Sequence, residues 1–354
     1  MTSTISAPTD DLAGRFGPRV AAGIRGTLGS LSGPTERSFP LRLEPLNKQK
    51  GGVYRIGTGT DARDSSIVVK RHSPDTARRN RRVVERWLPA LGLQGAAPAL
   101  LGAVAEDRAD RIWLLYEEAP GRALESPLST DVDAAAAVEL IATLHMKAAD
   151  HHLLPEIRRE GEDLGISYFT ANVEDALGLL EALRPPAVFP SAEQARIREG
   201  LRGRLRRLLD DAPRRAGLMA EAGGATTLLH GDLWTSNVFV DRADPEPARV
   251  RLIDWDHVGA GPIYYDLSTF LYRFPAAARP ALLARYGAVA ARSGWSLPPT
   301  AVANLLFETA ECARYANRII WPAIALLEED AAWGWEELAE IEGWFRALEP
   351  VLQE

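Results

Sequence analysis

Three polar side chains in the second half of the chain have the types and spacing of a metal-dependent active site. Asp232 and Asn237 lie five residues apart in the segment HGDLWTSN, which runs into the apolar segment VFV. Asp254 follows seventeen residues after Asn237, at the end of the segment RLI. Carboxylate and amide oxygens at neighbouring strand ends suit Mg²⁺, which completes its shell with water and phosphate. Asn237 and Asp254 are therefore candidate ligands for a Mg²⁺ ion, which could be one bound to a nucleoside triphosphate.

The third side chain, Asp232, is then available for acid–base chemistry. Its carboxylate can orient the hydroxyl group of a substrate and accept its proton, a contribution that is typically worth about 10²–10⁴ in rate. In phosphoryl transfer, charge neutralisation and alignment supply most of the remainder. If Asn237 and Asp254 hold Mg²⁺, the spacing thus leaves Asp232 free for this task.

Two residues in the first quarter of the chain have the pattern of a phosphate-binding pair. Lys70 ends the strand-like run IVVK, and Glu85 follows fifteen residues later, within a segment of helical spacing. A lysine presented by a strand and steered by a helix carboxylate can reach the α- and β-phosphates of a nucleotide. The chain has 41 basic residues but only four lysines, so a lysine at this position is less readily explained as incidental.

Further nucleotide contacts are expected from backbone groups. Gly51 and Gly52 form a turn between two strand-like segments, and glycines allow backbone N–H groups to approach phosphate closely. Residues 117–119 lie where the strand-rich part of the chain ends, and there Glu117 and Ala119 are placed to offer backbone groups to a flat base.

The elements around these residues predict an α+β protein of two lobes. Residues 37–119 have the order β-β-β-α-β-β, with the helix at 75–91, which describes a small antiparallel sheet packed on one helix. Residues 120–354 form a larger, mainly helical lobe that carries the catalytic loop and metal site. Residues 1–36 are an N-terminal extension with a weak helical pattern, either packed or loose. The helices of the larger lobe are expected at 131–150, 171–183, 192–220, 275–292, 299–320 and 334–347.

Composition limits the class of protein and its partners. The 354 residues are 46% hydrophobic and 25% charged, as in ordinary globular proteins. A net charge of −7 gives no general case for nucleic acid and mildly favours a cationic small molecule. The single Cys312 excludes an internal disulfide framework. With neither a signal-peptide pattern nor an apolar run long enough for a bilayer, we expect a cytoplasmic protein without membrane partners.

Together these motifs resemble the aminoglycoside phosphotransferase and choline kinase family, which has the bilobal protein-kinase-like fold. The resemblance runs from about Leu41 to Phe270. It is carried by three signatures, namely His-Gly-Asp at 230–232 with Asn237, Ile-Asp at 253–254, and Gly-Pro at 261–262 with Tyr-Asp-Leu at 265–267.

The resemblance implies a role for each matching residue. It implies that Asp232 is the base, Asn237 and Asp254 are Mg²⁺ ligands, and Asp266 is a buried carboxylate that braces the catalytic loop. Nucleotide binding is implied for Lys70 with Glu85 as its helix partner, for the carbonyl of Glu117, for the N–H of Ala119, and for the turn at Gly51 and Gly52. This chain departs from protein kinases in having Asp-Trp-Asp in place of Asp-Phe-Gly, and in lacking a full G-x-G-x-x-G motif.

The predicted function is an ATP- or GTP-dependent and Mg²⁺-dependent kinase of a small-molecule hydroxyl. The acceptor could be an aminoglycoside or other antibiotic, which would mean resistance, or equally an amino sugar or a choline-like alcohol. A pseudokinase would ordinarily lack one of the motif residues, and a protein kinase would have an Ala-Pro-Glu segment after a long activation loop. The sequence does not specify the oligomeric state.

Four further positions lie outside these assignments. Asp256 could contact metal or substrate, or be hydrogen-bonded to its own loop. His230 is expected to organise the catalytic loop through hydrogen bonds. Glu308 and Glu311 could belong to an acidic wall for an amine-bearing acceptor, although charged runs on helices are usually solvated faces.

Overall fold

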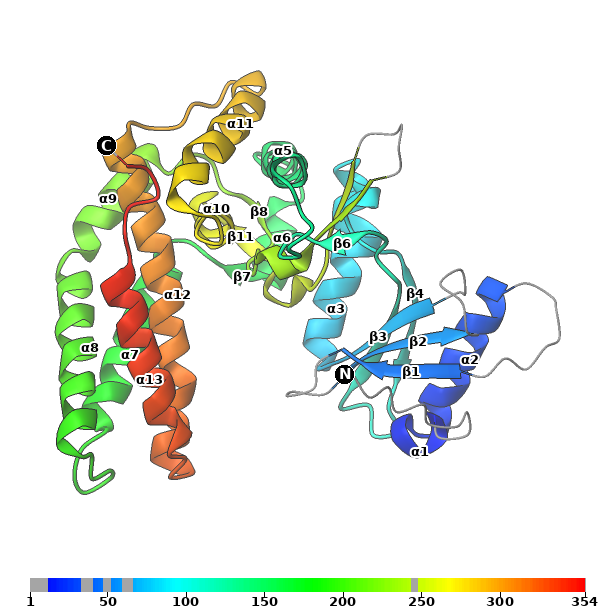
Figure 1. Cartoon of the computed structure of the whole chain (residues 1–354), viewed down its shortest axis with the longest axis horizontal. Helices are drawn as coiled ribbons and strands as arrows, with labels where there is room; N and C mark the ends of the chain where they lie inside the picture. The colour runs from blue at the N-terminus through cyan, green and yellow to red at the C-terminus, as the bar shows by residue number, and fades with distance from the viewer. Residues whose placement is uncertain (1–11, 33–40, 47–51, 59–65, 243–247, 354) are drawn as a thin grey trace. The chain divides into compact units, whose positions relative to one another are not determined.

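The computed structural model describes residues 12–32, 41–46, 52–58, 66–242 and 248–353, and it divides into two compact units (Figure 1). The first unit contains residues 1–129 and 236–256, and the second contains residues 130–235 and 257–354. Segment 236–256, which the sequence analysis placed in the larger lobe, thus clusters with the N-terminal part. The α+β fold, with a small antiparallel sheet and a mainly helical remainder, is confirmed.

A five-stranded antiparallel sheet forms the centre of the first unit. Its strand order is β1-β2-β3-β5-β4, and the helical segment lies between β3 and β4 in the chain, as the order β-β-β-α-β-β predicted. The strands are β1 (Leu41–Pro45), β2 (Val53–Thr58), β3 (Ser66–His72), β4 (Leu100–Ala105) and β5 (Ile112–Glu117).

Alternation along β3 determines the direction of Lys70. Successive side chains of a strand point to opposite faces of the sheet. Ile67 and Val69 are fully buried in an apolar core on one face, whereas Val68 and Lys70 line a cavity on the other. The alternation thus aims the Lys70 ammonium at the cavity.

The N-terminal extension is packed, at least over its described residues. Helices α1 (Leu12–Phe16) and α2 (Pro18–Ser32) bury Phe16, Val20 and Ile24 in the same core as Ile67 and Val69. Phe16 makes edge-to-face contacts with two aromatic rings of the sheet, those of Tyr54 and Trp113. The weak helical pattern of the sequence therefore corresponds to two helices that cover one face of the sheet.

Ile24→Ala should lower the free energy of unfolding of the first unit by about 2–5 kcal/mol. Ile24 has no exposed surface, and its truncation leaves a cavity between α2 and the sheet. Thermal and urea unfolding would measure the loss, with the exposed Arg25→Ala on the same helix as the matched control. Equal stability of the two variants would contradict this packing.

The helix after β3 contains an irregular turn. Helix α3 (Pro74–Arg82) is capped at its N-terminus by Ser73, whose hydroxyl accepts a hydrogen bond from the Thr76 N–H at 3.2 Å. A π-helical turn, η1 (Val83–Trp87), then follows, and α4 (Leu88–Ala90) completes the segment. Glu85 lies within the π-helical turn.

A second small sheet completes the first unit and contains the predicted metal ligands. Its order is β10-β9-β6, and Val238 of β9 pairs with Leu252 of β10 in antiparallel register. The 3₁₀ turn η3 (Thr235–Asn237) precedes β9, and the 3₁₀ turn η4 (Trp255–His257) follows β10. A third 3₁₀ turn, η2 (Gln94–Ala96), lies outside this sheet and precedes β4. The strands are β6 (Arg122–Ala123), β9 (Val238–Asp241) and β10 (Arg249–Leu252).

The second unit is mainly helical. The prediction of a single helix at 192–220 is wrong. This segment forms two helices, because Pro213 lacks an N–H and lies in the first turn of the second helix.

A short sheet of the second unit has the order β7-β11-β8. No described helix is long and apolar enough to cross a bilayer. The strands are β7 (Glu162–Asp163), β8 (Thr227–Leu229) and β11 (Gly259–Gly261); the 3₁₀ turn is η5 (Ala276–Ala278). The helices are α5 (Asp131–Ala148), α6 (Leu154–Glu160), α7 (Ile166–Ala182), α8 (Ala192–Asp210), α9 (Ala212–Ala222), α10 (Tyr264–Leu271), α11 (Arg279–Arg292), α12 (Thr300–Glu328) and α13 (Trp333–Ala347).

Candidate active site

The two predicted metal ligands lie at one end of the hairpin of β9 and β10. The Ile253 N–H donates to the Asn237 carbonyl at 2.9 Å, which continues the strand register by one pair and places Asp254 just beyond it. Asp254 has a φ of +66°, a left-handed conformation that is uncommon for residues other than glycine and typical of functional sites. Antiparallel pairing therefore brings Asn237 and Asp254 together from positions seventeen residues apart.

The donor set of this site fits Mg²⁺. It offers one carboxylate and one amide oxygen, and Mg²⁺ commonly takes one or two protein oxygens and leaves the remaining positions to water and phosphate. Among the described residues, no group of three or more His, Cys, Asp or Glu side chains is arranged to hold a metal ion.

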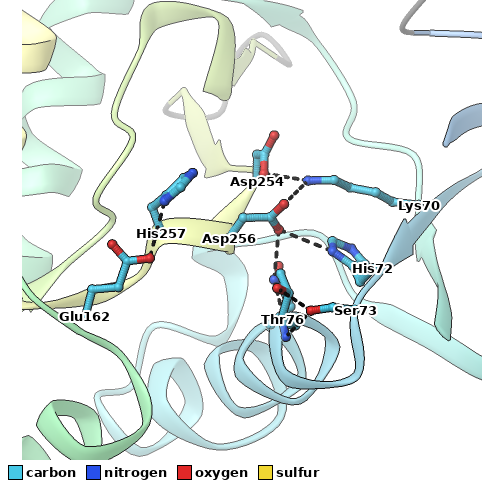
Figure 2. Close-up of polar contacts among 9 residues, drawn as sticks. Lys70, His72, Ser73, Thr76, Glu162, Asp254, Asp256 and His257 are labelled. Carbon is cyan, nitrogen blue, oxygen red and sulfur yellow. Dashed lines mark hydrogen bonds and ion pairs between the residues drawn. The ribbon is translucent and has the colours of Figure 1, made fainter. Parts of the chain in front are cut away.

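The Lys70 ammonium lies between two carboxylates of the loop after β10. Its Nζ atom is 2.6 Å from Asp254 Oδ1 and 2.8 Å from Asp256 Oδ2 (Figure 2). Burial lowers the pKa of Lys70, but the charges of Asp254 and Asp256 outweigh burial and the pKa is raised. Lys70 is therefore a charged group at neutral pH, next to a predicted metal ligand.

Glu85 does not pair with Lys70 among the described residues, so the helix partner implied by the resemblance is wrong in this structure. The Glu85 carboxylate lies 3.3 Å from the Arg81 guanidinium, one helical turn earlier, and 48% of its side chain is exposed. Asn80 and Val84 of the same helical segment line the cavity that contains Lys70, whereas Glu85 lines a separate surface hollow. The Glu85 carboxylate thus pairs with Arg81 of its own helical segment and not with the lysine.

Besides contacting Lys70, Asp256 accepts a hydrogen bond from Asn80 and lies close to His72. The Asp256 Oδ1 atom accepts a hydrogen bond from Asn80 Nδ2 at 3.0 Å. The same oxygen lies 3.5 Å from His72 Nδ1 (Figure 2). Burial raises the pKa of Asp256, but Lys70 and His72 outweigh burial and the pKa is lowered. These partners belong to β3 and α3 and not to the loop of Asp256 itself, so the contacts are of a kind that none of the three interpretations of Asp256 included. The sequence analysis did not identify Asn80 or His72, although period-two alternation places His72 on the face of Lys70.

His72 should make the protein less stable as the pH falls from about 6.5 to 4. Burial lowers the pKa of His72 to about 4, opposed by the charge of Asp256, with Lys70 lowering it further and Asp254 raising it. The unfolded chain therefore binds the proton first, and the free energy of unfolding falls with pH by about 3 kcal/mol across this window.

Urea unfolding of the wild type and of His72→Asn at several pH values would test this pH dependence. Asparagine keeps a donor near the Nδ1 position but does not titrate. The slope between pH 6.5 and 4 should become shallower in His72→Asn. His257→Asn is the control, because 60% of the His257 side chain is exposed beside Glu162. An unchanged slope in His72→Asn would contradict the assignment.

A cavity of about 280 Å³ lies within the first unit, close to the lower limit of typical small-molecule sites. Its walls are mainly apolar and include Tyr116 and Phe239, while Lys70 and Asp254 contribute charge. Neither aromatic residue was predicted from the sequence as part of a site. Of the predicted nucleotide-binding residues, Glu117 and Ala119 also line the cavity.

The glycine turn is described only in part. Gly52 has a φ of +79°, and its carbonyl accepts a hydrogen bond from the Arg71 N–H at 2.8 Å. This left-handed conformation favours glycine. Gly51 lies outside the described residues.

In the second unit, a buried carboxylate braces the loop that contains Asp232. Asp266 has no exposed surface, and its two oxygens accept hydrogen bonds from the His230 N–H at 2.7 Å and the Gly231 N–H at 2.9 Å. Burial raises the pKa of Asp266, but the hydrogen bond from His145 and the charge of His145 outweigh burial and the pKa is lowered. The bracing role expected for Asp266 is confirmed.

The local geometry explains why the loop has glycine at its second position. Gly231 has a φ of +84°, and a Cβ atom there would lie 1.8 Å from the His257 carbonyl oxygen. No side chain can occupy this position without moving the backbone. His230 Nδ1 accepts a hydrogen bond from the Asp232 N–H at 3.3 Å, which confirms that His230 helps to organise the loop.

The surroundings of Asp232 in the second unit include a buried ion pair. Arg314 is hydrogen-bonded to Glu311, which is 1% exposed, and its guanidinium lies over the Tyr265 ring. Burial lowers the pKa of Arg314, but Glu311 outweighs burial and the pKa is raised, with Asp232 among the nearby negative charges. Glu311 is thus neither a solvated residue nor a free acidic wall, and the sequence analysis did not identify its partner.

Comparisons with solved structures agree on the fold. The GDP complex of an aminoglycoside 2′-phosphotransferase of type IIIa is 16% identical, with 91% of this chain and 99% of that chain covered and a TM-score of 0.56. An ethanolamine kinase of Plasmodium vivax is 13% identical, with 90% and 85% covered and a TM-score of 0.56. A choline/ethanolamine kinase family protein of Mesorhizobium loti is 15% identical, with 92% and 93% covered and a TM-score of 0.55.

At these identities the solved structures establish the kinase-like fold alone. A search of curated proteins gives no match. The family model described as "phosphotransferase enzyme family" matches residues 43–301, more than half of the chain. The motifs at 230–237, 253–254 and 261–267 all lie within this match. This chain therefore belongs to the phosphotransferase enzyme family, as the resemblance in its sequence predicted.

Proposed function

We propose that this protein transfers the γ-phosphoryl group of ATP or GTP to a hydroxyl group of a small molecule in a Mg²⁺-dependent reaction. The observation that carries the proposal is the cavity of the first unit, where the charged Lys70 contacts Asp254 beside apolar walls. An apolar cavity suits a flat base, and the cation beside it suits phosphate.

Nucleotide binding is assigned to residues of the first unit. The Glu117 carbonyl and the Ala119 N–H would bind the base, and the backbone of Gly51 and Gly52 would cover the phosphates. Lys70 would bind the α- and β-phosphates. A GDP complex and an ADP complex among proteins of the same fold support a nucleoside phosphate as co-substrate.

Asn237 and Asp254 would hold Mg²⁺, which when bound neutralises charge on the phosphate oxygens. Asp232 of the second unit would accept the proton of the acceptor hydroxyl as the acceptor oxygen bonds to the γ-phosphorus. The bond from that phosphorus to its bridging oxygen breaks, and the nucleoside diphosphate leaves with the electron pair. Asp266 would keep the backbone of the Asp232 loop in place throughout.

The acceptor is proposed to be a small alcohol, with a cationic one favoured by the net charge of −7. Aminoglycosides, amino sugars and choline-like alcohols all meet this description. Buried Glu311 is neutralised by Arg314, so it does not add to the preference for a cation.

The function can be tested with a panel of candidate acceptors and ATP or GTP in the presence of Mg²⁺. Nucleotide consumption would be measured together with the mass of the product, which should increase by one phosphate group. Nucleotide binding without phosphate transfer to any alcohol would favour a binding protein. Transfer to protein substrates alone would favour a protein kinase.

A further inference from the structure

We propose that Asp256, and not the helix carboxylate Glu85, is the positioning residue of Lys70 in this enzyme. The inference rests on the proposed function, in which Lys70 binds the nucleotide phosphates. It assigns to Asp256 a task for which the residue needs no contact with metal, substrate or reacting atoms.

The two oxygens of Asp256 have separate partners. Oδ2 lies 2.8 Å from Lys70 Nζ, and Oδ1 faces His72 Nδ1 at 3.5 Å (Figure 2). Oδ1 also accepts a hydrogen bond from Asn80 Nδ2 at 3.0 Å. Asn80 and His72 are each only 4% exposed, so the groups that hold Oδ1 are themselves fixed by packing. A carboxylate held at one oxygen by α3 and β3 presents its other oxygen to the lysine in a fixed direction.

The helical segment has no carboxylate of its own for this task. Its only acidic residues are Asp75 and Glu85, and both pair with arginines of the same segment, Arg78 at 3.0 Å and Arg81 at 3.3 Å. Their side chains are 78% and 48% exposed. The link from the helix to the lysine runs instead through the Asn80 amide and the Asp256 carboxylate.

The second loop carboxylate is differently placed. Asp254 also contacts Lys70, but its side chain is 38% exposed against 26% for Asp256. Asp254 is assigned to the metal, so Lys70 and the metal would compete for the Asp254 carboxylate. Asp256 has no metal assigned to it. Asn80 and His72 lie at its Oδ1 atom, which leaves Oδ2 to Lys70.

The central test compares Asp256→Asn with Glu85→Gln, which are matched isosteric losses of one carboxylate charge. Asp256→Asn should lower kcat by about 10², because a misplaced phosphate-binding group costs this much in comparable sites. Glu85→Gln should stay within about twofold, as expected for an exposed ion pair. The reverse ranking, or equal kcat values in wild type and Asp256→Asn, would overturn the proposal.

Two measurements separate positioning from other roles. In a Lys70→Met background, Asp256→Asn should cause little additional loss of kcat, since its effect passes through the lysine. The Mg²⁺ concentration for half-maximal rate should stay within about threefold of wild type, whereas loss of a metal-bound group typically costs about 10–100-fold in metal affinity. Additive losses, or a large rise in the Mg²⁺ requirement, would overturn the proposal.

A measurement without turnover distinguishes failure of this inference from failure of the proposed function. The rate of amine labelling at Lys70, followed by mass spectrometry at one pH, should rise severalfold in Asp256→Asn and not in Glu85→Gln. Lys147 serves as the internal reference. Faster labelling in Asp256→Asn than in Glu85→Gln, in a protein that transfers no phosphate, would refute the proposed function but support the positioning of Lys70 by Asp256. Phosphate transfer without this difference in labelling would refute the positioning role.

Asn80→Leu provides a second variant if Asp256→Asn does not fold. It preserves both loop carboxylates and removes only the amide that holds Asp256 Oδ1. We expect a smaller loss of kcat than in Asp256→Asn, with more labelling at Lys70. Wild-type kcat and labelling in a folded Asn80→Leu protein would contradict the anchoring.

Discussion

Asp254→Asn is expected to lower turnover by at least about 10²–10³, because a metal ion at a transferring phosphoryl group supplies several kcal/mol and each 1.36 kcal/mol is tenfold in rate. The substitution keeps the volume of the side chain but replaces one charged oxygen with an amide nitrogen. It also weakens the contact with Lys70 Nζ at 2.6 Å. Both effects reduce charge neutralisation around the phosphates.

The measurements for Asp254→Asn are kcat and the dissociation constant of the nucleotide with and without Mg²⁺. Affinity for Mg²⁺–nucleotide should fall, and the gain in affinity that Mg²⁺ gives the wild type should shrink. Asp241→Asn, at the other end of β9, is the matched control and should behave like the wild type. Full activity in Asp254→Asn would show that the metal site is elsewhere.

The sequence predicts the hairpin part of the site well because short-range geometry determines it. Asn237 and Asp254 come together through the antiparallel register of two strands joined by a short connection, and alternation along β3 decides which face Lys70 occupies. The His-Gly-Asp pattern also predicts its own local structure, because Gly231 has a left-handed φ and no room for a side chain.

The sequence fails where tertiary packing selects one of several side chains. Glu85 is the obvious carboxylate on its helical segment, but it is Asn80 of this segment that contacts Asp256, the partner of Lys70. A single residue of offset along a helix rotates a side chain by about 100°, and helical periodicity alone does not determine this phase relative to the sheet.

Buried ion pairs and unit boundaries are also missed for physical reasons. Glu311 and Arg314 are three residues apart on α12, a spacing that equally suits a solvated face, and only packing around α12 shows that both are buried. Likewise, segment 236–256 is continuous in sequence with the helical part, yet β9 pairs with β6 of the first unit. Such long-range strand pairing is not encoded in local patterns.

Asp232→Asn is expected to lower kcat by about 10²–10⁴ while nucleotide affinity stays close to that of the wild type. The asparagine amide can still orient an acceptor hydroxyl, but it cannot accept its proton. The backbone of the loop should be unaffected, since Asp266 binds the N–H groups of His230 and Gly231 and not the side chain of Asp232. Rapid-quench kinetics and calorimetric titration of ADP would provide the two values.

The pair of results for Asp232→Asn separates the two halves of the proposed mechanism. Nucleotide binding is assigned wholly to the first unit, whereas Asp232 belongs to the second, so a loss of kcat without a loss of affinity locates proton transfer in the second unit. The exposed Asp175→Asn on α7 controls for the loss of a negative charge. Unchanged kcat in Asp232→Asn would exclude this residue as the base, and because the cavity and Lys70 would be untouched by that result, the search for the base would turn to the other carboxylates of the second unit.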